Sequence, residues 1–231
     1  MATFVLIHGA SADAHYWYLV RPLLANAGHT VVTPELPTDD PAADFDDYAS
    51  AVTTAIAGAN VEPQGLVIVG QSLGAFTAPI VAKAMNADRL VLVAPMIPAP
   101  GETPAAWGTN TGHETAMAEY ASEIGIDPKF DLMTTFMHDV PTDVTQDLMK
   151  RGEPTQSDTI FTKPFPLHEW PDISTAVIAG TLDRMFPIEF QQRLCRERLG
   201  LTPYEIPTGH LPAFANPHAL ASMLLAIEAT R

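Results

Sequence analysis

A serine stands between two glycines at the centre of a Gly-x-Ser-x-Gly motif that spans residues 70–74, with Ser72 in the middle. Four apolar residues, 66–69, run directly into the motif, and a segment of small residues suited to a helix follows it. A buried strand that turns sharply into a helix strains the backbone at the serine and exposes its hydroxyl. We therefore predict that Ser72 is a nucleophile. The alternative is an ordinary strand-to-helix turn in which Ser72 caps the helix.

A serine hydroxyl is too weak an acid to attack alone, so the chain must also supply a base and an acid. Asp183 follows the apolar run 175–180, and His210 follows the last expected strand, 204–206. Because the carboxyl ends of parallel strands meet at one edge of a sheet, we expect both side chains to lie near Ser72. His210 would take the serine proton and return it to the leaving group, while Asp183 fixes the imidazole tautomer and stabilises the imidazolium.

Attack on a carbonyl also requires two hydrogen-bond donors for the oxyanion that forms. The N–H of Leu73 lies at the positive end of the helix that follows Ser72 and is the first expected donor. The N–H of Ala10 is the second, because the loop after the first strand bends back at Gly9, where the missing side chain permits close approach. We interpret His8 as a residue that braces this loop.

Other acids and histidines fit these roles less well. His218 falls in the first turn of the closing helix and is interpreted as a surface residue, which leaves His210 as the base. Glu102 is the first acid after the fourth strand but lies well beyond its end, so Asp183 is the stronger candidate. Asp139 belongs to a segment between strands, and we expect it to be a turn or capping residue.

Composition limits the classes of partner. The 231 residues include 27 acidic and 12 basic ones, for a net charge of −15, with no Lys/Arg cluster, so nucleic acid and membrane surfaces are not expected partners. Neither a nucleotide-binding loop nor a metal-ligand spacing occurs, and we expect no cofactor and no metal. The single cysteine, Cys195, cannot form an internal disulfide and is expected to pack. With no signal peptide or membrane-spanning run, the expected location is cytoplasmic.

Strands and helices alternate along the chain, which predicts a parallel sheet covered by helices on both faces. The expected strands are 3–7, 30–33, 66–69, 89–94, 175–180 and 204–206, and the expected helices include 16–27, a helix from Asp44 or Asp46 to 59, 187–199 and 217–229. Residues 97–172 contain no convincing buried strand but carry helix-like patches at 114–124, 130–136 and 142–151. We predict one domain, 1–231, in which 97–172 form a small helical cap over the carboxyl edge of the sheet.

Several of these segments together resemble a known family. The matching segments are 4–10, Trp17, 21–24, 27–29, 70–74, Phe186, Phe190, Gln191 and Gly209–His210. The chain resembles an α/β-hydrolase of the small, cap-bearing esterase and hydroxynitrile-lyase group, which includes plant methylesterases. The resemblance implies a mostly parallel six-stranded sheet and the same catalytic residues and oxyanion donors. It departs at Gln71, where most esterases of the group have histidine, and in the cap, which is too dissimilar to carry over a substrate.

The predicted function is a cofactor-independent serine hydrolase that cleaves a small carboxylic ester through an acyl-enzyme. A lyase or a carbon–carbon hydrolase with the same catalytic residues, an adventitious perhydrolase activity, and a non-catalytic receptor for a small ligand are the alternatives. Hydroxynitrile lyases of the group typically have a lysine directly after the catalytic histidine and a threonine in the oxyanion loop. This chain has Leu211 and Gly9 there, which favours the esterase. The oligomeric state is open, with a homodimer among the alternatives.

Overall fold

A single parallel sheet organises the part of the chain that the computed structural model describes, residues 1–59 and 65–230. Within those residues it has six strands in the order β2-β1-β3-β4-β5-β6, and every neighbouring pair is parallel. The strands are β1 (Thr3–Ile7), β2 (Thr30–Val32), β3 (Leu66–Gln71), β4 (Arg89–Val93), β5 (Thr175–Gly180) and β6 (Tyr204–Ile206). The predicted fold class is confirmed, and the sheet is parallel throughout.

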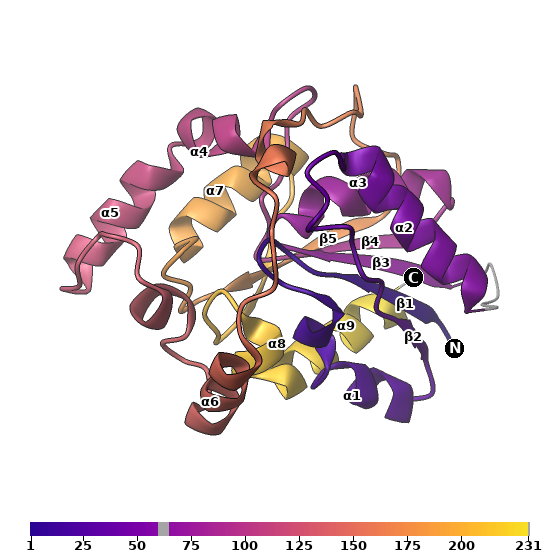
Figure 1. The fold of residues 1–231 in the computed structure, drawn as a ribbon, viewed down its shortest axis with the longest axis horizontal. Coiled ribbons are helices and arrows are strands. Elements are labelled where there is room, and N and C mark those ends of the chain that lie inside the picture. Colours follow the sequence, from indigo (N-terminus) through magenta and orange to yellow (C-terminus); the bar gives the residue numbers. More distant parts are fainter. Residues whose placement is uncertain (60–64, 231) are drawn as a thin grey trace.

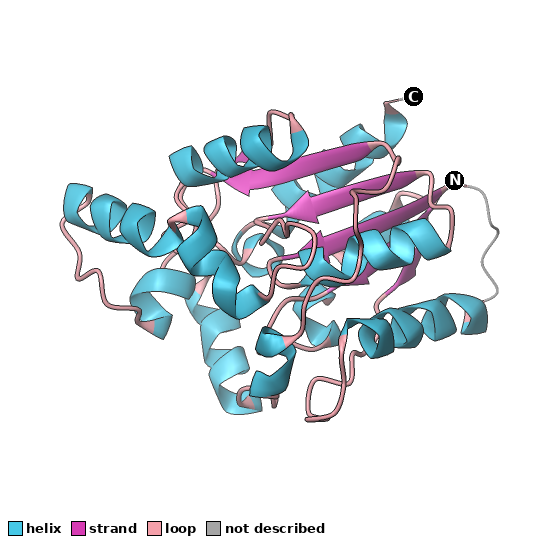
Figure 2. Cartoon of the chain, turned by 90° about the horizontal axis from the view of Figure 1, so that it is seen from above, coloured by secondary structure: helices cyan, strands magenta, loops and turns pink. Residues whose placement is uncertain are grey.

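Helices cover both faces of the sheet, because successive side chains of each strand point to opposite sides. Val5 and Ile7 face one core, which is covered by α2 (Phe45–Gly58), α3 (Gly74–Ala84) and α7 (Ile188–Leu199). Phe4 and Leu6 face the other core, which is covered by the 3₁₀ helix η1 (Ala14–Trp17), α1 (Arg21–Asn26), α8 (Pro212–Ala215) and α9 (Pro217–Ala229). Figure 2 shows the strands side by side between these helices.

Local capping explains why two of the predicted helices begin where they do. The carboxylate of Asp44 accepts from the backbone N–H of Asp46 and of Asp47, and the Asp47 side chain accepts in return from the Asp44 N–H. The side chain of Asn216 accepts from the Ala219 N–H at the start of α9. Both starts agree with the sequence prediction.

The expected helix 16–27 is wrong, since the structure has η1 and α1 there instead. Pro22 explains the break, because it has no backbone N–H and is tolerated only in the first turn of a helix. It lies in the first turn of α1, so a continuous helix would have placed it in an interior position. The short helix α8, which begins at Pro212 just beyond His210, was not predicted.

Residues 97–172 connect β4 to β5, and their helices α4, α5 and α6 lie beyond the carboxyl ends of the strands, on the left of Figure 1. We call these residues the inserted segment. It contains α4 (Pro104–Thr111), α5 (His113–Glu123), the π-helix η2 (Leu132–Phe136), α6 (Thr142–Arg151) and the 3₁₀ helix η3 (Asp158–Thr162). The patches predicted at 114–124, 130–136 and 142–151 correspond to α5, η2 and α6, whereas α4 and η3 were not predicted.

The single domain 1–231 stays a prediction, and residues 60–64 and 231 of that range lie outside the described part of the chain. None of the helices within residues 1–59 and 65–230 has the length and apolar character needed to cross a membrane.

Candidate active site

Ser72 occupies the tight turn between the end of β3 and the start of α3. Its φ of 51° is unusual for a residue with a side chain and indicates a strained backbone. The turn is too close-packed for side chains at the flanking glycines. A Cβ at Gly70 would lie 2.6 Å from the Cβ of Ala78, and one at Gly74 would lie 2.7 Å from the carbonyl oxygen of His8. The two glycines thus allow β3, α3 and the end of β1 to pack closely around Ser72.

His210 stands between Ser72 and Asp183. Its Nε2 lies 3.1 Å from the hydroxyl oxygen of Ser72, and its Nδ1 lies 2.9 Å from Oδ2 of Asp183. Because the Asp183 carboxylate accepts a hydrogen bond from the Nδ1–H group, the lone pair of Nε2 faces the serine hydroxyl. His210 and Asp183 are each 1% exposed. The three side chains predicted from the strand-end loops therefore form one hydrogen-bonded series.

Backbone and aromatic contacts fix this series in place. The second carboxylate oxygen of Asp183, Oδ1, accepts from the N–H groups of Met185 and Phe186, each at 2.8 Å. The rings of Phe186 and Phe136 pack edge to face with the His210 imidazole, at centroid distances of 4.6 and 4.9 Å. Asp183 cannot rotate without losing two hydrogen bonds, and the two phenylalanines shield the imidazole from solvent.

The two predicted oxyanion donors lie just beyond the ends of adjacent strands, since β1 pairs with β3 and Ile7 lies beside Gly70. Within the described residues, neither the N–H of Ala10 nor that of Leu73 has a protein acceptor. The imidazole of His8 is buried, which lowers its pKa, and its Nδ1 donates to the Gly9 carbonyl at 2.9 Å. This bond holds the loop that carries Ala10.

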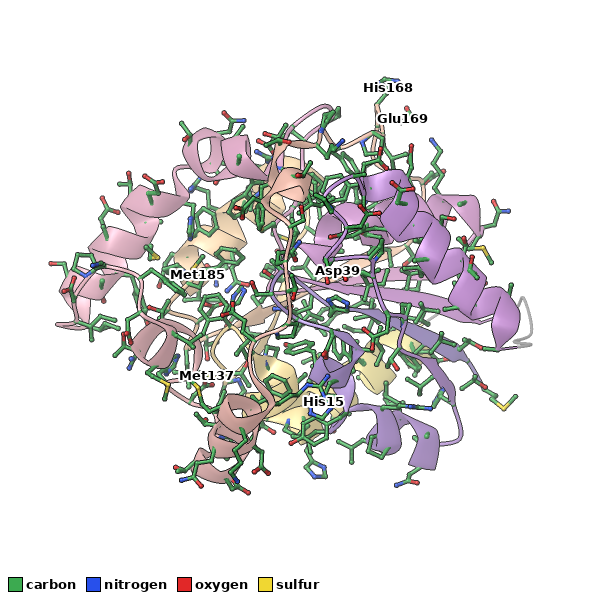
Figure 3. The ribbon with its side chains drawn as sticks, viewed as in Figure 1. His15, Asp39, Met137, His168, Glu169 and Met185 are labelled. Carbon is green, nitrogen blue, oxygen red and sulfur yellow. The ribbon has the colours of Figure 1, made fainter. Side chains whose placement is uncertain are left out.

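A cavity of about 380 Å³ opens beside Ser72 and His210. The inserted segment supplies most of its apolar wall, namely Phe130, Leu132, Phe136, Met137, Leu148 and Met149. Ser11, Asp13 and His15, near the end of β1, supply part of a polar wall. Figure 3 labels two of the lining residues, Met137 and His15. The site is thus an apolar cavity with the Ser72 hydroxyl in its wall.

The competing candidates lie elsewhere. His218 is exposed on α9, as expected. Glu102 is buried and forms an ion pair with Arg198 of α7, while Asn110 donates to the same carboxylate at 2.8 Å. Burial opposes the charge of Glu102, but these hydrogen bonds outweigh it and its pKa lies below the usual value. Glu102 anchors the inserted segment to α7.

Two polar contacts at the site were missed by sequence reasoning. The amide of Gln71 donates to the backbone carbonyl of His210 at 3.2 Å. The sequence singled out Gln71 by its position directly before Ser72, but it did not indicate this contact. Asp139 lies in a turn, as expected, but it does not cap α6, whose N-cap residue is Pro141. Its Oδ2 also accepts from the backbone N–H of Gly209, a contact that was not expected. No local sequence pattern predicts a contact between residues 70 positions apart.

In the part of the chain that the structure describes, no group of three or more His, Cys, Asp or Glu side chains could hold a metal ion. Cys195, on the buried face of α7, packs in the core as predicted, and burial raises the pKa of its thiol to about 11.

The sequence matches the model of the alpha/beta hydrolase family over residues 4–223. No protein of curated function matches it. Among solved structures, a pyrethroid hydrolase from Sphingobium faniae is 23% identical, with 99% of this chain and 98% of that one covered and a TM-score of 0.74.

A methylesterase from Arabidopsis is 19% identical, with 98% of each chain covered and a TM-score of 0.75. An extracellular alpha/beta-hydrolase from a Paenibacillus species is 20% identical, with 98% of each chain covered and a TM-score of 0.76. At these identities the likeness is one of fold.

Proposed function

We propose that this chain, which belongs to the alpha/beta hydrolase family, is a serine esterase that cleaves small carboxylic esters through an acyl-enzyme. The observation that carries the proposal is the series of hydrogen bonds from Ser72 through His210 to Asp183, at the wall of an apolar cavity. Nucleophile, base and orienting acid within hydrogen-bond reach are what acyl transfer requires.

Acylation begins when Nε2 of His210 takes the hydroxyl proton of Ser72 and the serine oxygen attacks the ester carbonyl. The carbonyl oxygen becomes an oxyanion, which the N–H groups of Ala10 and Leu73 stabilise. The tetrahedral intermediate collapses, the bond to the alcohol oxygen breaks, and His210 gives its proton to the departing alkoxide. Asp183 holds Nδ1–H throughout and stabilises the positive imidazolium.

Deacylation repeats these steps with water as the nucleophile. His210 takes a proton from the water, which attacks the acyl carbon, and then returns the proton to Ser72 as the carboxylic acid leaves. The apolar wall of the cavity suits the hydrocarbon part of an ester.

Two positions favour an esterase over a hydroxynitrile lyase. Leu211 follows His210 directly and lines the cavity, so no positive charge there stabilises a departing cyanide. Gly9 is tightly packed, because a Cβ at that position would lie 2.6 Å from Oε1 of Gln71 and 3.0 Å from the Cβ of Ser72, so a hydroxyl-bearing side chain there would force its neighbours to move. A carbon–carbon hydrolase and a small-ligand receptor remain alternatives on the same scaffold. The cytoplasmic location, the lack of nucleic-acid and membrane partners, and the oligomeric state stay predictions.

Labelling with a fluorophosphonate tests the proposal, because the reagent reports an activated serine without knowledge of the substrate. We expect labelling at Ser72 and hydrolysis of short-chain p-nitrophenyl esters. Ser72→Ala should abolish both while the protein stays folded, and neither protein should release appreciable cyanide from mandelonitrile. Ester hydrolysis that survives Ser72→Ala at more than about one part in a thousand would contradict the mechanism. Cyanide release that depends on Ser72 and His210 would instead identify a lyase.

A further inference from the structure

A second carboxylate reaches the loop that carries the base. Asp139 lies in the inserted segment between η2 and α6, and its Oδ2 accepts from the backbone N–H of Gly209, the residue immediately before His210. The two residues are 70 positions apart, so this bond joins the inserted segment to the loop after β6. A charged acceptor makes such a bond stronger than one between neutral groups.

The contact between Asp139 and Gly209 is close and largely buried. The Asp139 side chain is 15% exposed, and its Oδ1 is buried with no hydrogen-bond partner among the described residues. A Cβ at Gly209 would lie 2.6 Å from that oxygen and 2.8 Å from Nε2 of His138. Any side chain at position 209 would therefore force the two segments apart, and the glycine permits the carboxylate to reach the backbone.

Asp139 does not take the place of Asp183 as the acid. Nδ1 of His210 is already bound by Asp183 at 2.9 Å, and Asp139 binds the main chain one residue earlier. Its hydrogen bond therefore acts on the imidazole through the backbone. The same stretch of the inserted segment also supplies Phe136, which packs against the His210 ring, and Met137, which lines the cavity.

We propose that Asp139 is a positioning residue that holds the Gly209–His210 backbone in place so that the imidazole reaches Ser72 and Asp183 at once. The inference rests on the proposed serine-hydrolase function. His210 must keep two distances together, 3.1 Å to Ser72 and 2.9 Å to Asp183, and a shift of its backbone lengthens at least one of them. A misplacement of about 1 Å in a catalytic group costs on the order of 100-fold in rate.

Asp139→Ala, Asp139→Asn and a matched control, Asp143→Asn, test the inference. Asp143 is an exposed carboxylate in the first turn of α6 and contacts nothing in the site. We expect Asp139→Ala to lower kcat about 10- to 100-fold with KM nearly unchanged, and to slow fluorophosphonate labelling of Ser72 in parallel. Asp139→Asn should retain most of the parent protein's kcat, because its amide oxygen can still accept from the Gly209 N–H. Asp143→Asn should match the parent protein.

Gly209→Ala disrupts the same contact by changing the partner residue. It therefore tests the inference even if Asp139→Ala fails to fold. Its methyl group should displace the carboxylate and lower kcat, and the cost should be smaller when Asp139 is already alanine. An unchanged kcat in Asp139→Ala, or additive effects in the double variant, would overturn the inference. A parent protein that shows no Ser72-dependent activity would instead refute the proposed function.

Discussion

The loops at the carboxyl ends of the strands and the inserted segment contribute to the site in different ways. The strand-end loops carry the reacting groups on rigid supports, since Ser72 is fixed by a strained turn and Asp183 by two backbone hydrogen bonds. The inserted segment lines the cavity and joins the rest of the molecule through polar contacts of graded burial. The three contacts are Asp139 with the Gly209 backbone, Glu102 with Arg198, and Arg151 with Asp13.

This difference indicates where each kind of substitution should act. Changes in the strand-end loops should affect the chemical step with little effect on stability. Apart from Asp139, which we propose positions His210, changes in the inserted segment should affect stability or substrate binding in proportion to the burial of the contact. The side chain of Glu102 is 4% exposed, whereas that of Arg151 is 47% exposed. Burial strengthens a charge pair and raises the cost of leaving one partner alone.

The largest effect is expected at Asp183. Asp183→Asn should lower kcat about 10³- to 10⁴-fold, because an amide at this position favours the imidazole tautomer that cannot accept the serine proton. Steady-state kinetics on a p-nitrophenyl ester, with thermal unfolding to confirm the fold, measure the effect.

Glu102→Gln is the comparison for activity, because Glu102 is the other acid considered from the sequence. It should retain kcat close to that of the parent protein. If Glu102→Gln were the inactive variant and Asp183→Asn the active one, the acid would have been assigned to the wrong strand and the division between the two regions would fail.

The two regions also differ in how much of them the sequence predicts. Strands such as 66–69 and 175–180 are continuous apolar runs, and the strand-end rule brings Ser72, Asp183 and His210 together without any knowledge of distances. Their catalytic roles stay predictions. In the inserted segment α4 was missed because only a few of its residues face the core. The bond between Asp139 and Gly209 was missed because periodicity reports local structure and not long-range polar contacts.

The second largest effect is expected at Glu102, on stability. Glu102→Gln should lower the free energy of unfolding by about 1–3 kcal/mol, because it leaves the Arg198 guanidinium, 15% exposed, without its carboxylate. Denaturant unfolding at neutral pH measures the loss. Glu197→Gln is the control, since Glu197 pairs with Arg193 at an exposed position on the same helix as Arg198 and should change stability little.

The loss at Glu102 should depend on pH. The pKa of Glu102 is lowered in the folded state because the hydrogen bonds from Arg198 and Asn110 outweigh burial. Its contribution is therefore fully present above the ordinary value of 4.5 and disappears as the pH falls through the lower folded value. The difference between the parent protein and Glu102→Gln should shrink below that pH. A difference that stays constant would mean that the carboxylate's charge is not the source of the stabilisation.

The smallest effect is expected at Arg151, which closes α6 and binds the carboxylate of Asp13 across the polar wall of the cavity. Because this pair is half exposed, Arg151→Ala should cost less than about 1 kcal/mol of unfolding free energy, and the cost should fall further at high salt. Lys150→Ala, which removes the neighbouring exposed cation of α6, is the control.

The same substitution should also affect substrate binding. Arg151→Ala should leave kcat unchanged, but it leaves the negative charge of Asp13 unpaired at the cavity wall. KM should therefore rise more for an anionic ester than for a neutral one. An effect on stability as large as that of Glu102→Gln would show that burial does not rank the contacts of the inserted segment.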